Sequence, residues 1–210
     1  MNIIKNIVNR TNKFSSKKYW DDRYKEKGNS GDGSYGDLAS FKAGYINKII
    51  KDNNIETVYE FGCGDGNNLK YYNIRNYIGT DVSETVMDWC KEMFSRDGSK
   101  RFISYNNFWK NIDLMKLEKP DMTMSLDVVY HLIEDTVFEK HMEDLFRSRR
   151  FVLIYASNEK ERRVLKAQHV KMRRFTDWVN KNKKDWKLLE VERQKYPDQS
   201  RSDFYLFERI

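Results

Sequence analysis

The stretch from Thr57 to Asp81 constrains the fold more than any other part of the chain. It begins with a short run of β-branched and aromatic residues, Thr57 to Phe61, which predicts a buried strand. Three glycines follow at alternate positions: Gly62, Gly64 and Gly66. The missing Cβ atoms allow a tight turn there and let a ligand approach the backbone closely. A second short strand, from Tyr77 to Thr80, then ends on the carboxylate of Asp81.

The ligand predicted for this turn is a nucleoside that carries positive charge. In a doubly wound sheet, neighbouring strand ends of this kind hold a nucleoside, and the carboxylate accepts hydrogen bonds from its ribose. A dinucleotide fingerprint would read G-x-G-x-x-G, but the third glycine comes one position early and Asn67 takes its place. Glu60 stands two residues before the first glycine, where a carboxylate would repel a pyrophosphate and attract a cation.

Patterns typical of helices and strands alternate along the rest of the chain. Apolar residues recur at helical spacing at Asp37–Lys51, from Ser83 to Phe94, from Asp135 to Phe146 and after Thr176. Five further strands are predicted at Arg101–Tyr105, Met122–Leu126, Phe151–Tyr155, Trp186–Val191 and Asp203–Glu208. This alternation predicts an α/β fold, with helices packed against a mostly parallel sheet of seven strands.

Length and composition limit the number of domains and indicate where in the cell the protein is located. A chain of 210 residues fits one domain, which we place at residues 19–210, after a basic N-terminal arm or loosely docked helix at residues 1–18. No apolar run approaches the ~20 residues that span a bilayer, and Met1 to Val8 is too polar for a secretory signal. We therefore expect a cytoplasmic protein without a membrane span, in the host cytoplasm if the source is a virus.

No metal site is predicted from the spacing of ligand residues, and a divalent metal stays open as an alternative. Cys63 and Cys90 lack the spacing of metal ligands or of a redox pair, so both are expected to pack as small apolar side chains. Asp127, His131 and Asn158 follow strand ends that could be adjacent, but they form no recognisable ligand motif.

The segment from Gly28 to Gly36 is too rich in glycine and short polar residues to hold regular structure. It precedes the first core helix, which places it near the same edge of the sheet as the glycine turn. We consider two roles for it: a lid whose Tyr35 reaches the ligand, or a surface loop without a function. A lid would serve a reaction from which water has to be excluded.

Polar residues follow the ends of the third and fourth predicted strands. Asn106 comes after the third strand, and Asp127 and His131 come after the fourth. Because parallel strands share one carboxyl edge, these side chains are brought toward the glycine turn. His169 lies in a later basic segment, and His141 falls within a predicted helix, where we expect a structural or solvated side chain.

Glu60, the glycine turn and Asp81 together resemble the cofactor site of the Rossmann-like, class I methyltransferases that use S-adenosylmethionine. That cofactor has a sulfonium, an ammonium and a ribose but no phosphate. The resemblance implies a three-layer Rossmann-like sandwich whose seven-stranded sheet ends in an antiparallel strand. It also implies that Asp81 binds the ribose, that Glu60 lies near the methionine part or the turn, that Asn106 meets the adenine, and that Asp127 lies beside the transferable methyl group. The alternative is a glycine turn of another α/β domain.

Seven sequence blocks resemble a narrower group of small bacterial and viral methyltransferases found with glycan-assembly enzymes. The blocks are Y-W-D-D-R-Y, G-D-G-S-Y-G-D-L-A-S-F-K-A, Y-E-F-G-C-G-D-G-N, Y-I-G-T-D-V-S, S-L-D-V-V-Y-H-L-I-E-D, Q-H-V-K-M-R-R-F-T-D-W-V and S-D-F-Y-L-F. They span Tyr19 to Phe207. This resemblance implies O-methylation of a sugar hydroxyl, with a surface glycan or a sugar as the acceptor.

Such a hydroxyl needs a general base, because it is a poor nucleophile while protonated. His131 is the first candidate, since histidine titrates near neutrality and this one follows the fourth strand. His169 is the second, and Asp127 could orient either ring. The alternative for His131 is a purely structural imidazole.

Two other functions remain open. Residues 159–187 contain eleven Lys and Arg residues against four acids, an excess of seven that equals the formal net charge of the chain, +7. This segment could bind nucleic acid weakly, as in an RNA or mRNA-cap methyltransferase, or it could be a solvated face without a partner. The other function is a non-catalytic subunit that binds the cofactor only. The intact Glu60, glycine turn and Asp81 argue against a loss of cofactor binding.

Overall fold

The structure is a computed structural model that describes residues 14–164 and 167–210. Its strands are β1 (Thr57–Phe61), β2 (Asn76–Thr80), β3 (Lys100–Phe102), β4 (Met122–Leu126), β5 (Phe151–Ala156), β6 (Arg162–Arg163), β7 (Lys171–Met172), β8 (Trp186–Glu192) and β9 (Asp203–Arg209). Its helices are α1 (Ser16–Lys25), α2 (Gly36–Asp52), α3 (Glu84–Met93), α4 (Phe108–Leu114), α5 (Asp135–Leu145) and α6 (Phe175–Asn182). Short 3-10 turns lie at Asp32–Ser34, Asn68–Tyr71 and Val129–His131.

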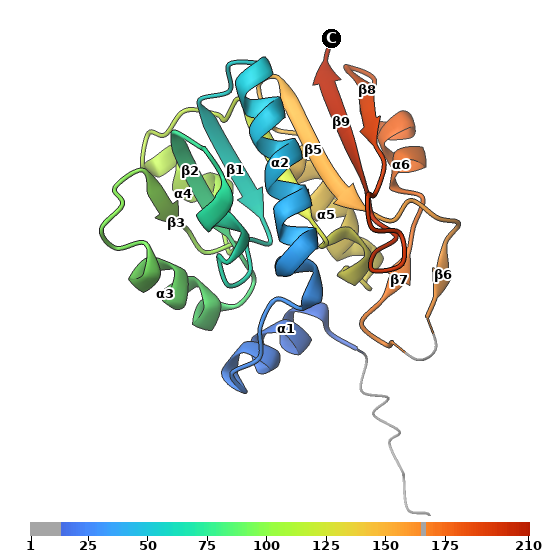
Figure 1. Cartoon of the computed structure of the whole chain (residues 1–210), viewed down its shortest axis with the longest axis horizontal. Coiled ribbons are helices and arrows are strands. Elements are labelled where there is room, and N and C mark those ends of the chain that lie inside the picture. The colour runs from blue at the N-terminus through green and yellow to red at the C-terminus, as the bar shows by residue number, and fades with distance from the viewer. Residues whose placement is uncertain (1–13, 165–166) are drawn as a thin grey trace, which may run out of the picture.

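Seven strands form one sheet in the order β3-β2-β1-β4-β5-β9-β8, and β6 and β7 pair with each other in a separate ribbon. Strands β1 to β5 are parallel, whereas β9 runs antiparallel between β5 and β8. Helices α2 and α3 cover one face of the sheet, and α4, α5 and α6 cover the other (Figure 1). The α/β class, the three layers, the seven strands and the antiparallel last strand are confirmed.

Each face of the sheet has its own hydrophobic core. Strand β5 reads F-V-L-I-Y-A and is buried along its whole length, as expected for a strand covered on both faces. Its side chains alternate between the two cores, because successive residues of a strand point to opposite faces. Val152 and Ile154 pack with α5 and α6, and Leu153 and Tyr155 pack with α2. The sheet is therefore fixed from both sides, and its carboxyl edge is a rigid support for a site.

The structure differs from the sequence predictions at several boundaries. Strand β3 ends at Phe102, before the predicted end at Tyr105, although the Ile103 and Tyr105 N–H groups still donate to the carbonyl oxygens of Gly79 and Asp81. Helix α4 and the β6–β7 ribbon were not predicted, since elements this short carry little periodicity. Helix α1 begins at Ser16, before the domain boundary predicted at residue 19. Residues 1–13 of the predicted arm lie outside the described residues.

In the part of the chain that the structure describes, no helix is both long and apolar enough to cross a bilayer. The described residues also contain no group of three or more His, Cys, Asp and Glu side chains placed to hold a metal ion.

A buried ion pair connects α2 to the end of β4. Lys42 on α2 is only 1% exposed, and its Nζ lies 2.9 Å from Oδ2 of Asp127. Asp127 follows β4 directly and has a left-handed backbone, with a φ of 60°. A buried ammonium is costly unless it is paired, and so is a carboxylate that loses its cation. The position of Asp127 therefore depends on Lys42.

The substitution Lys42→Met tests this connection. Methionine keeps most of the side-chain length but leaves Asp127 without its cation, so we expect the free energy of unfolding to fall by about 3 kcal/mol in a urea titration. Lys48→Met is the matched control on the same helix, because Lys48 is 57% exposed and its pair with Asp52 lies in solvent. The control should change stability by less than about 1 kcal/mol. Equal losses in the two variants would contradict the role of Lys42.

Candidate active site

The glycine turn after β1 has a backbone that glycine adopts without strain. Gly62 and Gly64 have φ angles of 83° and 55°. A Cβ atom on Gly62 would lie 2.4 Å from Val128 Cγ2, and one on Gly64 would lie 2.2 Å from Ser30 Oγ. Gly66 packs against α3 instead. The turn is thus closely covered by the chain after β4 and by the loop before α2, with no room for side chains of its own.

Asp81 lies beside this turn because β1 and β2 are parallel neighbours, with Phe61 opposite Thr80. Its Oδ2 accepts a hydrogen bond from the Gly64 N–H at 3.2 Å, and its Oδ1 accepts one from the Ser83 N–H at 3.1 Å. The side chain is buried, and burial raises the pKa of Asp81 to about 6, even though these hydrogen bonds oppose the rise. Ionisation of Asp81 therefore costs free energy.

Glu60, the second-to-last residue of β1, is also buried, with 4% of its surface exposed. The Tyr77 hydroxyl donates a hydrogen bond of 2.6 Å to its Oε2. Burial raises the pKa of Glu60 to about 7, although the Tyr77 hydrogen bond and the charge of Lys42 act against it. Two buried carboxylates thus lie next to the glycine turn. An arriving cation would stabilise the ionised form of both.

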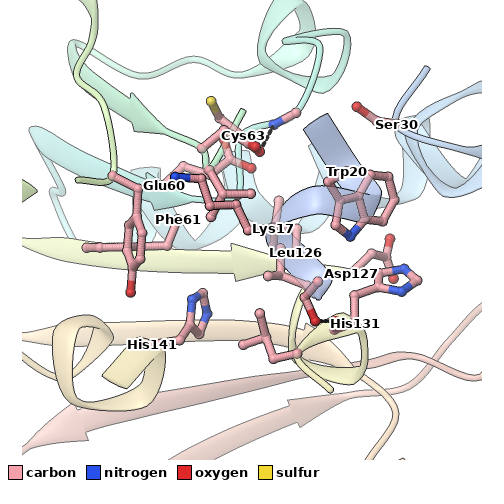
Figure 2. A pocket seen from close by; sticks show the side chains of 18 of the residues that line it. Lys17, Trp20, Ser30, Glu60, Phe61, Cys63, Leu126, Asp127, His131 and His141 are labelled. Atoms are coloured by element: carbon pink, nitrogen blue, oxygen red, sulfur yellow. Dashed lines mark hydrogen bonds between the residues drawn. The ribbon is translucent and has the colours of Figure 1, made fainter. Parts of the chain in front are cut away.

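A cavity of about 190 Å³ opens at the carboxyl ends of β1, β2 and β4 (Figure 2). Six of the sequence-predicted site residues line it: Glu60, Gly62, Gly64, Asp81, Asp127 and His131. The other four are not among its lining residues: Tyr35, Gly66, Asn106 and His169. Figure 2 shows Trp20 and His131 together at one end of the cavity, with Glu60 and His141 toward the other. The structure therefore joins the ends of three strands in one cavity.

The loop from Gly28 to Gly36 is held on the glycine turn by Asp65. The Ser30 N–H and the Tyr35 hydroxyl both donate to Asp65 Oδ2, at 2.9 and 2.8 Å, and the Asp65 N–H donates back to Ser30 Oγ at 2.8 Å. Tyr35 is 39% exposed, whereas Ser30 lines the cavity. The loop therefore covers the turn, and Ser30 rather than Tyr35 reaches the inside.

Both carboxylate oxygens of Asp127 have partners. Oδ2 binds Lys42, and Oδ1 accepts hydrogen bonds from the Tyr130 hydroxyl at 2.9 Å and the Ser202 hydroxyl at 3.1 Å. The hydrogen bonds of the described residues do not join Asp127 to His131 or His169. Asp127 thus fixes the end of β4 and one wall of the cavity, and another group orients the histidine.

That group is the backbone of His169. The Nδ1 atom of His131 lies 2.9 Å from the His169 carbonyl oxygen. Because a carbonyl oxygen can only accept, Nδ1 carries the proton, and Nε2 of the neutral ring keeps its lone pair. Burial lowers the pKa of His131 to about 4, so the ring is neutral at physiological pH. His131 is therefore in the form that can accept a proton at Nε2.

Aromatic rings surround His131 at this end of the cavity. Its ring stacks on that of His169, with centroids 5.3 Å apart, and His169 in turn stacks on Tyr19 at 4.7 Å. Trp20 meets the His131 ring edge-on at 4.9 Å. Ser16, at the start of α1, donates from Oγ to the His131 carbonyl oxygen at 2.9 Å. Helix α1 thus closes the cavity on the side of His131.

The opposite end of the cavity contains Tyr105 and His141. Asn106, which was predicted to meet the ligand, is exposed, and its neighbour Tyr105 lines the cavity instead. His141 on α5 is buried, its Nε2 lies 2.9 Å from Ser125 Oγ, and burial lowers its pKa to about 4. The side chain is structural, as predicted, but it also forms part of the cavity wall.

Sequence reasoning missed several residues in or beside the cavity, and three of them, Lys42, Trp20 and Tyr24, carried a signal in the sequence. Lys42 falls one helical turn from both Leu38 and Ile46, within the apolar stripe of α2, where a lysine is unexpected. Trp20 and Tyr24 share one face of α1, and both line the cavity. Nothing in the sequence placed α1 against the end of β4, because that contact joins segments more than a hundred residues apart.

No protein-family model matches the chain, and no curated protein matches its sequence. Solved structures do match. Magnesium protoporphyrin IX methyltransferase (ChlM) from Synechocystis PCC 6803, with bound SAH, has 16% identity and a TM-score of 0.60 over 92% of this chain and 98% of that one. N-methyltransferase NodS from Bradyrhizobium japonicum WM9, in complex with S-adenosyl-L-homocysteine, has 9% identity and a TM-score of 0.63 over 93% of this chain and 99% of that one. The methyltransferase domain of bacterial CtHen1-C has 19% identity and a TM-score of 0.58 over 80% and 96%.

The fold is that of the class I S-adenosylmethionine-dependent methyltransferases. At these identities the likeness shows the fold of the chain, and its reaction has to be argued from its own residues. In this methyltransferase fold, the cavity lies at the carboxyl edge of the sheet, where open α/β sheets bind ligands.

The raised pKa of Glu60 predicts a stability that depends on pH. Between about pH 4.5, where a glutamate of the unfolded chain titrates, and about pH 7, the folded protein binds this proton more tightly than the unfolded chain. The tighter binding of this proton stabilises the folded protein at low pH, and the free energy of unfolding falls by that amount as the pH rises through the window. In Glu60→Gln the loss is absent, so the stability of the variant relative to wild type should rise between pH 5 and pH 8, by on the order of 2–3 kcal/mol.

Urea titrations of both proteins at a series of pH values measure this difference, in which titrating groups that do not interact with Glu60 cancel. Glu56→Gln is the control, because Glu56 flanks the same strand and is 62% exposed. It should show no comparable gain. A Glu60→Gln difference that stays flat from pH 5 to pH 8 would show that Glu60 ionises freely in the folded protein.

Proposed function

We propose that this protein is an S-adenosylmethionine-dependent methyltransferase that O-methylates a sugar hydroxyl of a surface glycan. The observation that carries the proposal is the pair of buried carboxylates, Glu60 and Asp81, which line one cavity together with Gly62 and Gly64 of the glycine turn. Ionised carboxylates with raised pKa values favour a cationic ligand and oppose a phosphate. The residues present therefore fit S-adenosylmethionine and do not fit NAD or a nucleoside triphosphate.

The residues of the cavity divide the binding of the cofactor between them. Asp81 is placed to accept hydrogen bonds from ribose hydroxyls, and Glu60 supplies negative charge near the methionine part. When bound, S-adenosylmethionine supplies an electrophilic methyl group on a cationic sulfonium. Alignment of the acceptor with that group by the cavity walls can lower the barrier by on the order of 7–11 kcal/mol. Helix α1 and the Gly28–Gly36 loop lie side by side over His131 and the glycine turn, and they would exclude water there.

His131 is the general base of the proposed reaction. Its Nε2 atom accepts the proton of the acceptor hydroxyl, because Nδ1 is already bound to the His169 carbonyl oxygen. The low pKa keeps the ring neutral before the reaction. Trp20 lies against this ring and lines the cavity, and it offers an apolar face for a sugar ring. The assignment of a sugar acceptor rests on the resemblance to glycan-associated methyltransferases.

The alternative, RNA or mRNA-cap methylation, depends on the basic excess of residues 159–187. In the structure, several of these cations are paired with acids of other segments: Lys171 with Asp135 and Lys183 with Glu143, as well as Lys187 with Glu208. Paired charges contribute less to the electrostatic attraction that nucleic-acid binding needs. We therefore rank RNA as the second candidate acceptor. The first candidate is a glycan, with residues 19–210 as one catalytic domain.

Two substitutions separate binding from catalysis. Asp81→Asn should weaken cofactor binding, measured by calorimetry, because a neutral amide no longer supplies charge at the ribose. His131→Ala should bind the cofactor as wild type does and lose about 10²–10⁴-fold in turnover, as expected for the loss of a general base. Asp88→Asn is the control, because Asp88 is 72% exposed on α3. Cofactor binding that is unchanged in Asp81→Asn, or absent in wild type, would overturn the proposed cofactor site.

The acceptor is tested by transfer of a labelled methyl group to a panel of nucleotide sugars, reducing-end-linked oligosaccharides and capped RNA. We expect label on a saccharide. Transfer to capped RNA, with an affinity that falls steeply as salt is raised, would replace the glycan by the alternative acceptor.

A further inference from the structure

The β6–β7 ribbon contacts the segment that carries His131. The ribbon lies between β5 and α6, outside the seven-stranded sheet, and pairs Arg162 with Met172 and the next residues with one another (Figure 1). Two-residue strands bury little surface and add little stability of their own. Their role has to be sought in what they contact.

Three residues at the β7 end of the ribbon contact the segment 131–135. The His169 carbonyl oxygen, in the turn before β7, accepts the hydrogen bond from His131 Nδ1. Lys171 donates from Nζ to Asp135 Oδ1 at 2.6 Å. Arg173 donates from one guanidinium nitrogen to the carbonyl oxygens of residues 132 and 133, at 2.9 and 3.2 Å. The segment is therefore held by this part of the chain at both of its ends and in its middle.

These contacts are made by buried cations. Lys171 is 8% exposed and Arg173 is 4% exposed, and both lie within 3 Å of Oδ1 of Asp135. The guanidinium also lies over the Phe138 ring, 4.7 Å from its centroid. Asp135 is 70% exposed, so each ion pair joins a buried cation to a carboxylate that reaches solvent. A buried cation is costly unless its donors have partners, so these contacts favour the arrangement of the segment 131–135 that supplies them.

We propose that the β6–β7 ribbon is the positioning element of the base: Arg173 and Lys171 hold the segment 131–135 so that the His169 carbonyl oxygen keeps the proton of His131 on Nδ1. The inference rests on the proposed function of His131 as general base. His169, which the sequence offered as a second base, is a positioning residue in this arrangement, and it acts through its backbone oxygen. None of the three ribbon residues lines the cavity. Their substitution is therefore expected to change proton transfer and to leave cofactor binding intact.

The decisive measurement is the tautomer of His131, read from ¹⁵N chemical shifts of the imidazole nitrogens in the full-length protein. The chain has only three histidines, so the His131 signals are identified by their loss in His131→Ala. Wild type should show a neutral ring with the proton on Nδ1. Arg173→Met should show a mixture of tautomers, with turnover on the order of 10²-fold lower, as for a misplaced catalytic group, and with unchanged cofactor affinity.

Arg174→Met is the matched control, because Arg174 is adjacent in the chain and exposed. It should keep the wild-type tautomer and turnover. Arg173→Lys, which retains one cationic donor, should recover part of the turnover and of the Nδ1–H form. If Arg173→Met does not fold, Lys171→Met and Arg173→Lys carry the same test with smaller expected shifts.

The outcomes separate this inference from the proposed function. A wild-type ring with its proton on Nε2, or folded ribbon variants with an unchanged tautomer, would overturn the positioning role whatever the activity. Full turnover in His131→Ala would instead remove the base, while a tautomer that shifts in Arg173→Met would still establish the ribbon contact.

Discussion

The site depends on two carboxylates held at the ends of adjacent parallel strands in an apolar setting. The pairing of β1 with β2 fixes Glu60 and Asp81 beside the glycine turn, and burial keeps water from solvating them. Burial raises both pKa values, so ionisation of the two groups costs free energy. A ligand that brings positive charge into the crevice removes the cost, whereas a phosphate would increase it. The same electrostatic argument thus accounts for the raised pKa values and for the kind of ligand that fits.

The other end of the cavity is assembled from three segments that are far apart in the sequence. Helix α1 contributes Ser16 and Trp20, the end of β4 contributes His131, and the β6–β7 ribbon contributes the carbonyl oxygen of His169. The histidine is neutral because it is buried, and it is oriented because its Nδ1–H has an acceptor. Neither property belongs to the segment 127–133 alone. Both arise when the three segments pack together.

This difference explains how much could be predicted. The fold followed from the sequence, since strand patterns are local. The sequence also marked Glu60, Gly62, Gly64 and Asp81, which line one cavity, because they lie within one continuous stretch. The surroundings of His131 could not be derived, because their contacts span distances such as the 118 residues between Ser16 and Glu134. After β3, Tyr105 lines the cavity and the predicted Asn106 is exposed. Lys42 interrupted an apolar stripe and was the one long-range partner that the sequence marked.

The same division bears on how this fold can serve different acceptors. Solved structures with 9–19% identity share this fold, and the parts that surround His131 lie outside its central sheet, in α1 and in the ribbon between β5 and α6. A helix and a ribbon at these places can change in sequence without disturbing the two cores, because neither forms a strand of the central sheet. They also contact His131, the proposed base, directly. If His131 has that role, a change of acceptor through these elements would change the orientation of its ring at the same time, and acceptor recognition would be coupled to proton transfer.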